Sequence, residues 1–482
     1  MIFRSRKRLI PFLFGLGTFI VILAAPDFPP VTDPHGNPVL LSHEGKAALG
    51  LFLLAGIWWV FEVVPVGITA IGIGVVQSLW LIRDSRTALT DFMDPSVWFI
   101  FGSLLIGAAF IKTGLTRRLA FLVLSHISED TRLIYLGAFG LTSFLTLFMA
   151  HTAVAAALFP LLLVVHGLYE PAGHRTVFGK GLFIGMAWTA GAGSIITLLG
   201  AARGAVAIGF FKELTGQEIS FFEVTRFMLP LGALMVILLW GYVCLAFPPE
   251  RTRLPGLKTK ARGLADQLGR MTKRELATLV ITVAVVAALS LRAFVPALGH
   301  INKSAIILSA VMLFFMLDIL NIKDLEAVPW NIVLLFGGAM SIGFCLWQTG
   351  AAEWLAIGWL SWFKQAPWLV FIMGIAFFVL VMTNFIMNVA AIAITLPVAL
   401  VMARFIGVEP EIVMFAALAA AGMPFMLLVG AAPNAIAFES GQFRTREFFL
   451  YGIPPSLMLL AVLALFVWKI WPWMGMPVLI GQ

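Results

Sequence analysis

Charged and polar side chains inside long apolar stretches are the residues of this sequence best suited to chemistry. Arg203 stands in the apolar run 178–212, and His151 stands in a second such run, 134–167. A guanidinium is always charged, and its planar fork suits carboxylate or sulfonate oxygens. An imidazole exchanges a proton near neutral pH. The two residues indicate recognition of a small anion, with a proton as one candidate coupling ion.

Motifs of intramembrane catalysis are absent from the sequence. The apolar runs contain no His-Glu-x-x-His, no Gly-x-Ser-x-Gly and no paired catalytic aspartates. The two cysteines, Cys244 and Cys345, lie in apolar runs and suggest neither a disulfide nor a metal site. We therefore expect no enzymatic activity and no cofactor.

Four stretches of non-helical backbone are expected at membrane depth. Two are the turns of the long segments 134–167 and 366–403, and two are the Gly-rich stretches 191–204 and 422–434. Such backbone is tolerated only where it is buried in protein or lines a cavity. Helix starts expose N–H groups that attract anions, and helix ends expose carbonyls that coordinate Na⁺. Four such breaks predict an anion site flanked by two cation sites.

Three short motifs recur in the same order in the second half of the chain. The pairs are Ile106-Gly107 with Ile342-Gly343, His151-Thr152-Ala153 with Asn388-Val389-Ala390, and Gly200-Ala201-Ala202 with Gly430-Ala431-Ala432. Repetition in order at nearly constant spacing argues for a duplicated unit of roughly half the chain. Such duplication in a membrane protein is typical of secondary transporters, which hold their substrate between the halves.

Composition identifies an integral membrane protein. Of the 482 residues, 61% are hydrophobic and 12% are charged, against about 45–50% and about 25% in soluble domains. The apolar run 9–25 is followed by Pro26-Asp27-Phe28, a poor cleavage site, so we expect a retained first helix. Basic loops account for the net charge of +8, and no nucleic-acid partner is expected.

The distribution of Lys and Arg predicts the orientation. Four basic residues precede the first span, namely Arg4, Arg6, Lys7 and Arg8. The polar stretch 248–275 holds eight more, whereas 27–44 holds none. By the positive-inside rule, the N-terminus and 248–275 are cytoplasmic and 27–44 is external. The bacterial inner membrane is the expected location, with an external C-terminus.

The apolar runs predict an all-α polytopic membrane protein with about eleven transmembrane helices in two inverted repeats. The expected spans are 8–26, 46–63, 65–83, 96–125, 178–212, 222–247, 276–297, 302–321, 330–364, 409–438 and 447–475. Segments 134–167 and 366–403 are too long for one helix, so we expect re-entrant helical hairpins there. The expected organisation is an N-terminal helix and external loop (1–45), a first repeat (46–247), a cytoplasmic basic linker (248–275) and a second repeat (276–482).

Three further motifs carry a family resemblance. They are Trp58-Trp59 with Glu62, Pro65 and Thr69; Val328-Pro329-Trp330-Asn331 leading to Gly337-Gly338; and Ala432-Pro433-Asn434. The sequence thereby resembles the divalent anion–sodium symporters, an INDY-like family that carries dicarboxylates, tricarboxylates and sulfate. The resemblance spans about residues 46 to 475. It implies an inverted-repeat fold with broken helices, a homodimer, and a scaffold that holds an elevator-like transport domain.

The resemblance also implies a set of site residues. The family has Ser-Asn-Thr at both hairpin tips, whereas this chain has Ala150-His151-Thr152 and Met387-Asn388-Val389, so one polar anion contact remains at each tip. The expected substrate-binding residues are Thr152, Asn388, Arg203, His151, Val389, Pro433 and Asn434. A degenerate first Na⁺ site maps onto Thr146, His151 and Gly200, with a hydroxyl lost at Ala150. A second, better preserved Na⁺ site maps onto Thr383, Asn388 and Gly430.

The difference between the halves suggests how the carrier works. An arginine at mid-membrane costs about 2.5–3.5 kcal/mol, so we expect Arg203 to face an aqueous cavity or an anion. With His151, it would supply fixed positive charge where relatives use the first Na⁺. The sequence thus predicts secondary active transport of small, divalent anions by elevator-type alternating access, as sodium-independent exchange. The alternatives are a Na⁺-coupled di/tricarboxylate or sulfate symporter and, more distantly, an anion channel.

Overall fold

The protein is almost entirely helical. The computed structural model describes residues 6–32, 37–126, 128–363 and 367–481; Arg4 lies outside these residues. Among them, eight helices are long and apolar enough to cross a membrane, and five apolar helices are shorter. Strands β1 (Val31–Thr32) and β2 (Pro38–Val39) form a small antiparallel ribbon. The prediction of an all-helical polytopic membrane protein is confirmed.

The helices of the first half follow one another with short connections. They are α1 (Arg6–Ala24), α2 (His43–Val60), α3 (Val66–Leu79), α4 (Ser85–Thr90), η2 (Asp91–Met93), α5 (Pro95–Thr113), α6 (Leu115–His126), α7 (Thr131–Leu145), α8 (His151–Tyr169), α9 (Val177–Gly193), α10 (Ala202–Thr215) and α11 (Phe221–Ala246). Helix α12 (Leu257–Gln267) connects this half to the next one.

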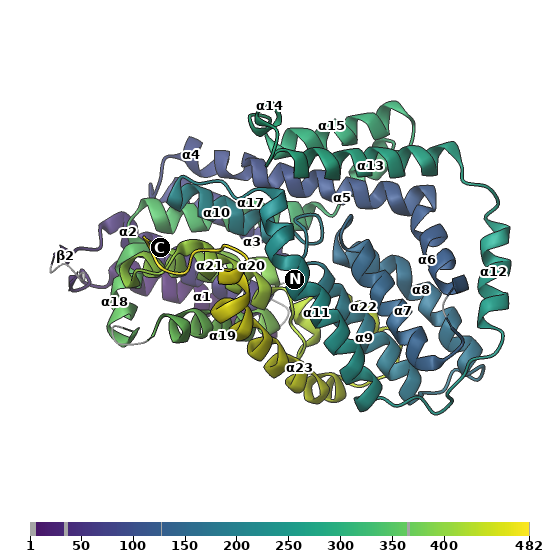
Figure 1. Ribbon diagram of the computed structural model, residues 1–482. Coiled ribbons are helices and arrows are strands. Elements are labelled where there is room, and N and C mark those ends of the chain that lie inside the picture. Colours follow the sequence, from purple (N-terminus) through teal and green to yellow (C-terminus); the bar gives the residue numbers. More distant parts are fainter. Residues whose placement is uncertain (1–5, 33–36, 127, 364–366, 482) are drawn as a thin grey trace.

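The second half contains a similar succession of helices. They are α13 (Lys273–Leu291), α14 (Pro296–Gly299), α15 (Lys303–Met316), α16 (Ile322–Glu326), α17 (Trp330–Gln348), α18 (Ala351–Phe363), α19 (Trp368–Phe385), α20 (Asn388–Ile406), α21 (Pro410–Ala421), η3 (Leu428–Gly430), α22 (Ala432–Phe438), α23 (Thr445–Leu465), η4 (Phe466–Ile470) and α24 (Trp471–Trp473). Helices of one half pack against helices of the other (Figure 1): α3 against α17, α5 against α15, α8 against α22, and α10 against α20.

Two expected single spans are each broken into two helices. The predicted spans 96–125 and 330–364 each contain a turn: α5 ends at Thr113, before Gly114 with a φ of 85°, and α17 ends at Gln348, shortly before Gly350 with a φ of 74°. A glycine in the left-handed region ends a helix at little steric cost. Each break turns the chain away from the helix that precedes it.

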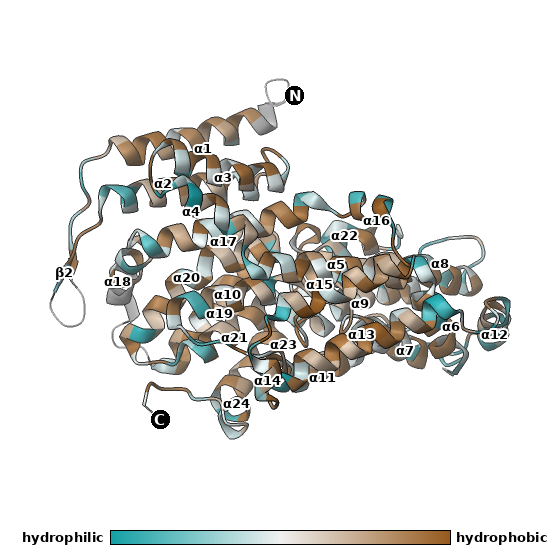
Figure 2. Cartoon of the chain, turned by 90° about the horizontal axis from the view of Figure 1, so that it is seen from above, coloured by the Kyte–Doolittle hydropathy of each residue, from teal (hydrophilic) through white to brown (hydrophobic). Residues whose placement is uncertain are grey.

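The polar stretch 248–275 is not irregular throughout, because it contains α12. This helix packs against α6, and its buried residues are Leu257 and Ala261. Figure 1 places α12 at one end of the molecule beside α6, and Figure 2 shows hydrophilic residues along it, whereas the long helices are mostly hydrophobic. An amphipathic helix of this kind suits a membrane–water interface.

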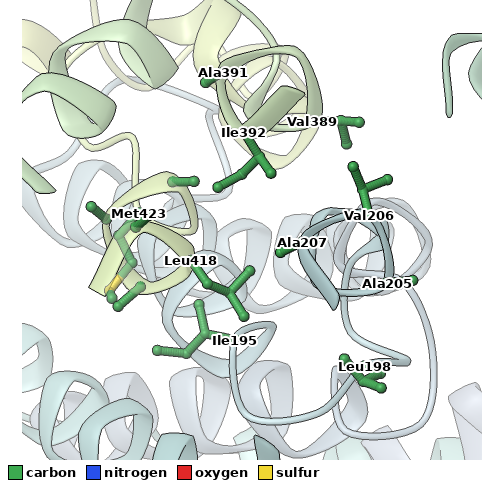
Figure 3. Close-up of a cluster of buried hydrophobic side chains, with 14 of the residues drawn as sticks. Ile195, Leu198, Ala205, Val206, Ala207, Val389, Ala391, Ile392, Leu418 and Met423 are labelled. Carbon is green, nitrogen blue, oxygen red and sulfur yellow. The ribbon is translucent and has the colours of Figure 1, made fainter. Parts of the chain in front are cut away.

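The two halves share a buried apolar core next to their broken helices. Figure 3 shows Ile195, from the connection between α9 and α10, close to Leu418 of α21, with Leu198 of the same connection and Ile392 of α20 in the surrounding cluster. All four side chains are at most 3% exposed. This shared packing fixes the connections of both halves relative to each other.

Candidate functional site

The predicted hairpin tips and helix breaks meet around one cavity of about 340 Å³. Its wall contains 150–153 and 387–389, from the starts of α8 and α20. It also contains 201–202 and 429–432, from the starts of α10 and α22. The structure therefore brings both halves of the duplicated sequence to one site.

The opposite wall comes from segments that sequence reasoning did not assign to the site. Ile100, Ser103 and Leu104 of α5 line it, together with 327–329, Ile332 and Phe336. Ser103 is 5% exposed and donates its hydroxyl hydrogen to the Ile100 carbonyl at 2.8 Å. The Val328-Pro329 motif was the available signal for this wall, but it was used only as a family signature.

Uncapped helix starts give the cavity wall its chemistry. Helices α8, α10 and α20 begin there after Ala150, Ala201 and Met387, and none of these three residues makes a side-chain capping bond. The first N–H groups of a helix lack intrahelical acceptors and carry the positive end of the helix dipole. Three such helix starts around one cavity form a site suited to an anion.

His151 closes the first-half connection. Its backbone N–H donates to the Gly200 carbonyl at 2.9 Å, and its ring Nδ1 lies 3.1 Å from the same oxygen. Since a carbonyl only accepts, Nδ1 carries the hydrogen. The Gly200 oxygen thus has both lone pairs engaged by one residue. It is no longer a free ligand for a cation.

The second half differs at the equivalent place. Within the described residues, no hydrogen bond joins Asn388 to Gly430, and none to the Gly430 carbonyl is recorded. Thr383 is fully buried and donates its hydroxyl hydrogen to the Ala421 carbonyl at 3.0 Å. Oxygen ligands of this kind, from carbonyls, amides and hydroxyls, suit a hard cation. The second half therefore keeps a carbonyl that a sodium ion can use.

Gly200 and Gly430 allow both connections to approach the preceding hairpins closely. A Cβ on Gly200 would lie 2.7 Å from the Thr146 carbonyl oxygen, and one on Gly430 would lie 2.6 Å from the Thr383 carbonyl oxygen. A side chain at either position would displace the connection. The Thr146 hydroxyl itself donates to the Ser143 carbonyl at 2.6 Å.

The structure places Arg203 behind the cavity wall and not in its lining. Its side chain is completely buried and donates from Nη2 to the Ser194 hydroxyl at 2.7 Å. Its Nε and Nη1 atoms have no hydrogen-bond partner. Its neighbour Ala202 lines the cavity, whereas Arg203, one position further around α10, points back toward Gly422. The guanidinium thus contributes charge to the site without direct contact.

Two other expected substrate contacts are also directed elsewhere. Asn434 donates from its side-chain nitrogen to the Pro424 carbonyl at 2.8 Å and the Leu427 carbonyl at 3.0 Å. These bonds fix the connection that precedes α22. Pro433 is buried beside it, and neither residue is among those that line the cavity. Of the predicted set, the structure brings His151, Thr152, Asn388, Val389 and Gly430 together at the cavity wall.

Asp324 is a cavity residue that the sequence did not single out. It lines the wall and forms an ion pair with Lys112, the two charged atoms being 2.5 Å apart. The residues lie far apart in sequence, on α16 and at the end of α5, so no local pattern reveals the pair. The lysine neutralises the carboxylate that would otherwise repel an anion.

Comparison with known proteins is consistent with this geometry. A family model described as "Sodium:sulfate symporter transmembrane region" matches residues 22–477. The chain is 24% identical to the sodium-dependent dicarboxylate transporter SdcS of Staphylococcus saprophyticus, over 95% of this chain and 92% of that protein. It is 27% identical to SdcS of Staphylococcus aureus (strain bovine RF122), over 97% and 93%.

Two solved structures share the fold at low sequence identity. MtrF of Neisseria gonorrhoeae, described as illuminating a class of antimetabolite efflux pumps, matches with a TM-score of 0.62 at 12% identity, over 98% of this chain and 97% of that chain. The YdaH transporter of Alcanivorax borkumensis matches with a TM-score of 0.60 at 14% identity, over 98% and 99%. These similarities concern the fold alone.

Proposed function

The chain belongs to the sodium:sulfate symporter family, and from that premise we propose that it carries a small divalent anion across the membrane together with sodium. The family is one of anion transporters and not of enzymes. The SdcS relatives are sodium-dependent dicarboxylate transporters. This comparison favours sodium-coupled symport over the sodium-independent exchange that the sequence suggested.

The anion occupies the cavity between the starts of α8, α10 and α20. The uncapped helix starts are the observation that carries this proposal, because their N–H groups need acceptors and attract negative charge. Thr152 and Asn388 add one polar side chain from each half. Arg203 adds positive charge from behind the wall.

One sodium ion binds in the second half, near Thr383, Asn388 and Gly430. The support is the Gly430 carbonyl, which accepts no recorded hydrogen bond among the described residues. The equivalent Gly200 carbonyl is occupied by His151. Coupling therefore involves the second-half site, and the first-half site is closed.

The architecture we propose has two inverted repeats, 46–247 and 276–482, each with a re-entrant hairpin, α7–α8 and α19–α20. The hairpins and broken helices form a transport domain that moves in an elevator-like manner against a scaffold. The N-terminus and the linker 248–275 face the cytoplasm, and the C-terminus faces outward in a bacterial inner membrane. Two copies form a homodimer.

Uptake into proteoliposomes tests the proposed function. Labelled succinate and labelled sulfate are offered with an inward Na⁺ gradient, and with choline in place of Na⁺ as the control. We expect one of the two anions to accumulate in Na⁺ and not in choline. Asn388→Ala should abolish the uptake, because Asn388 belongs to both the anion site and the sodium site, whereas Ser309→Ala, on α15 and outside the cavity lining, should not. Equal uptake in Na⁺ and choline contradicts the proposal.

A second candidate is sodium-independent exchange, favoured by the unpaired charge of Arg203 and by the occupied Gly200 carbonyl. In that mechanism the guanidinium takes the place of a transported cation. Arg203→Ala would then abolish transport in choline. Transport that rises steeply with external Na⁺ and survives this substitution excludes the fixed-charge mechanism.

A further inference from the structure

A second and larger cavity lies between α6, α8 and α12. Its volume is about 630 Å³, within the range of about 300–1,000 Å³ that is usual for small-molecule sites. Ten of its thirteen lining residues are apolar, among them Phe121, Leu161 and Leu264. A lining of this kind favours a hydrocarbon chain over a hydrated ion.

Only three of the described residues of this lining are polar or charged. They are Thr116, Arg117 and Gln267. Thr116 is only 2% exposed, and its hydroxyl oxygen has no hydrogen-bond partner. A buried hydroxyl without a partner is unfavourable, and the charged Arg117 is therefore the more accessible polar group of this lining.

Arg117 is the charged group at the same place. It is exposed, and it makes no ion pair within the described part of the chain. Its neighbour Arg118 differs, because Arg118 pairs with Glu275 at 2.8 Å and donates to the Gly269 carbonyl at 2.9 Å. Arg118 therefore holds the end of α12 against α6, while Arg117 remains available to an anion.

The geometry points to an anionic phospholipid as the occupant, with one acyl chain in the apolar part of the cavity and its phosphate at Arg117. Gln267 donates a hydrogen bond to the headgroup. Further basic residues, Lys258, Lys260 and Arg262, lie earlier in α12 and outside the cavity lining. A basic side chain near an anionic leaflet attracts anionic lipid, so the charge of Arg117 and the apolar lining select the same ligand.

The lipid cavity shares two wall residues, Ile111 and Ala156, with the cavity at the hairpin tips. A bound acyl chain would thus pack against α8, the helix that also presents Thr152 to the first cavity. Lipid binding itself does not depend on the proposed transport function. It would nevertheless stabilise the position of α8.

Photolabelling of the full-length protein tests this inference. The probe is a phosphatidylglycerol with a photoreactive group on one acyl chain, added to protein in phosphatidylcholine nanodiscs, and the labelled peptides are identified by mass spectrometry. We expect labels on α6, α8 and α12, near Phe121, Leu161 and Leu264. Unlabelled phosphatidylglycerol should compete, whereas phosphatidylcholine and glycerol 3-phosphate should not.

Two variants separate the specific site from general surface charge. Arg117→Ala should lower labelling by about fivefold, the factor expected for one basic side chain near an anionic leaflet. Lys260→Ala, an exposed basic residue of α12 outside the cavity lining, should leave labelling nearly unchanged. Labels elsewhere in the chain, equal competition by phosphatidylcholine, or equal effects of the two variants would overturn the inference. Competition by glycerol 3-phosphate would show that the site binds a soluble phosphate and not a lipid.

Discussion

The Gly200 carbonyl accepts two hydrogen bonds from His151. The Gly430 carbonyl lies at the equivalent place in the second half, and among the described residues no hydrogen bond to it is recorded. One residue difference, His151 against Asn388, thus changes the ligands that each half offers to a cation. Arg203 adds to this asymmetry, since its buried guanidinium has one recorded acceptor, the Ser194 hydroxyl. The two halves therefore have similar backbone connections at the cavity but different distributions of charged and polar side chains.

Replacing His151 by asparagine tests the role of the ring. His151→Asn removes the Nδ1–H bond and frees one lone pair of the Gly200 carbonyl, so a second sodium ion can bind. We expect the dependence of initial uptake on Na⁺ concentration to become steeper than in the wild type. The measurement is uptake at constant ionic strength, with choline replacing Na⁺. A curve of unchanged shape, with normal protein stability, would show that His151 does not block the first site.

Helix ends determine the course of the chain at the element scale. Gly114 and Gly350 follow α5 and α17 with positive φ angles, so the chain turns at equivalent places in both halves. Fixed connections then hold the helix starts at the cavity. Asn384, for example, accepts hydrogen bonds from the Met426 and Leu427 N–H groups at 2.9 Å and 3.2 Å.

Two glycine substitutions at uncrowded positions isolate the effect of backbone strain on stability. A Cβ on Gly350 or on Gly72 would meet no atom within 4 Å, but only Gly350 has a positive φ. Gly350→Ala should therefore destabilise the protein by about 1–2 kcal/mol, whereas Gly72→Ala, inside α3, should stabilise it by about 0.5–1 kcal/mol. Thermal unfolding in detergent measures the stability of both variants against the wild type. A drop in Tm of similar size for the two variants would contradict this explanation.

Glu250 should make the junction of α8, α9 and the linker sensitive to acid. Burial raises the pKa of its carboxyl. Hydrogen bonds to the carboxylate have the larger combined effect and hold that pKa below its usual value. The donors are the N–H groups of Val177, Glu250 itself and Phe178, and the Tyr169 hydroxyl. A lowered pKa in the folded state contributes stability that is full above about pH 4.3 and is lost as the pH falls through the folded-state value.

The pH dependence of unfolding checks this contribution. Wild type and Glu250→Gln are compared by thermal unfolding from neutral to acidic pH. We expect the Tm of the wild type to exceed that of the variant at neutral pH and the difference to shrink below about pH 4. A constant difference across the range would mean that Glu250 acts through packing and not through its charge.

Contacts between the halves define the site at the scale of the whole molecule. The cavity takes its wall from the starts of helices in both halves and from α5 opposite them. Helices α8 and α22 pack together, as do α10 and α20, so each half supports the other's connections. A cavity between two packed halves suits the alternating access that we propose.

Counter-transport distinguishes a carrier from a channel with the same cavity. Proteoliposomes loaded with unlabelled substrate should take up labelled substrate faster than empty ones, because a carrier returns more quickly with its site occupied. The substrate is the anion that the Na⁺-gradient assay identifies. Uptake rates independent of internal substrate would favour the channel alternative.

The sequence by itself determined the membrane class and the family, and it predicted a duplicated order of helices. These properties rest on composition and on local patterns, such as the glycines that end helices and the motifs His151-Thr152 and Asn388-Val389. Local patterns also predicted chain breaks near 146–152 and 383–389, and the structure has helix ends at both places. They could not show the direction in which each side chain points once α10 is packed.

Only the tertiary structure decided which of the predicted residues share a cavity. Arg203 and Asn434 face the packed connections because neighbouring helices fix the rotation of α10 and α22. The Lys112–Asp324 pair and the lipid cavity at Arg117 join segments distant in sequence. Such contacts depend on how the halves pack, and packing is set by the whole chain rather than by any local run of residues.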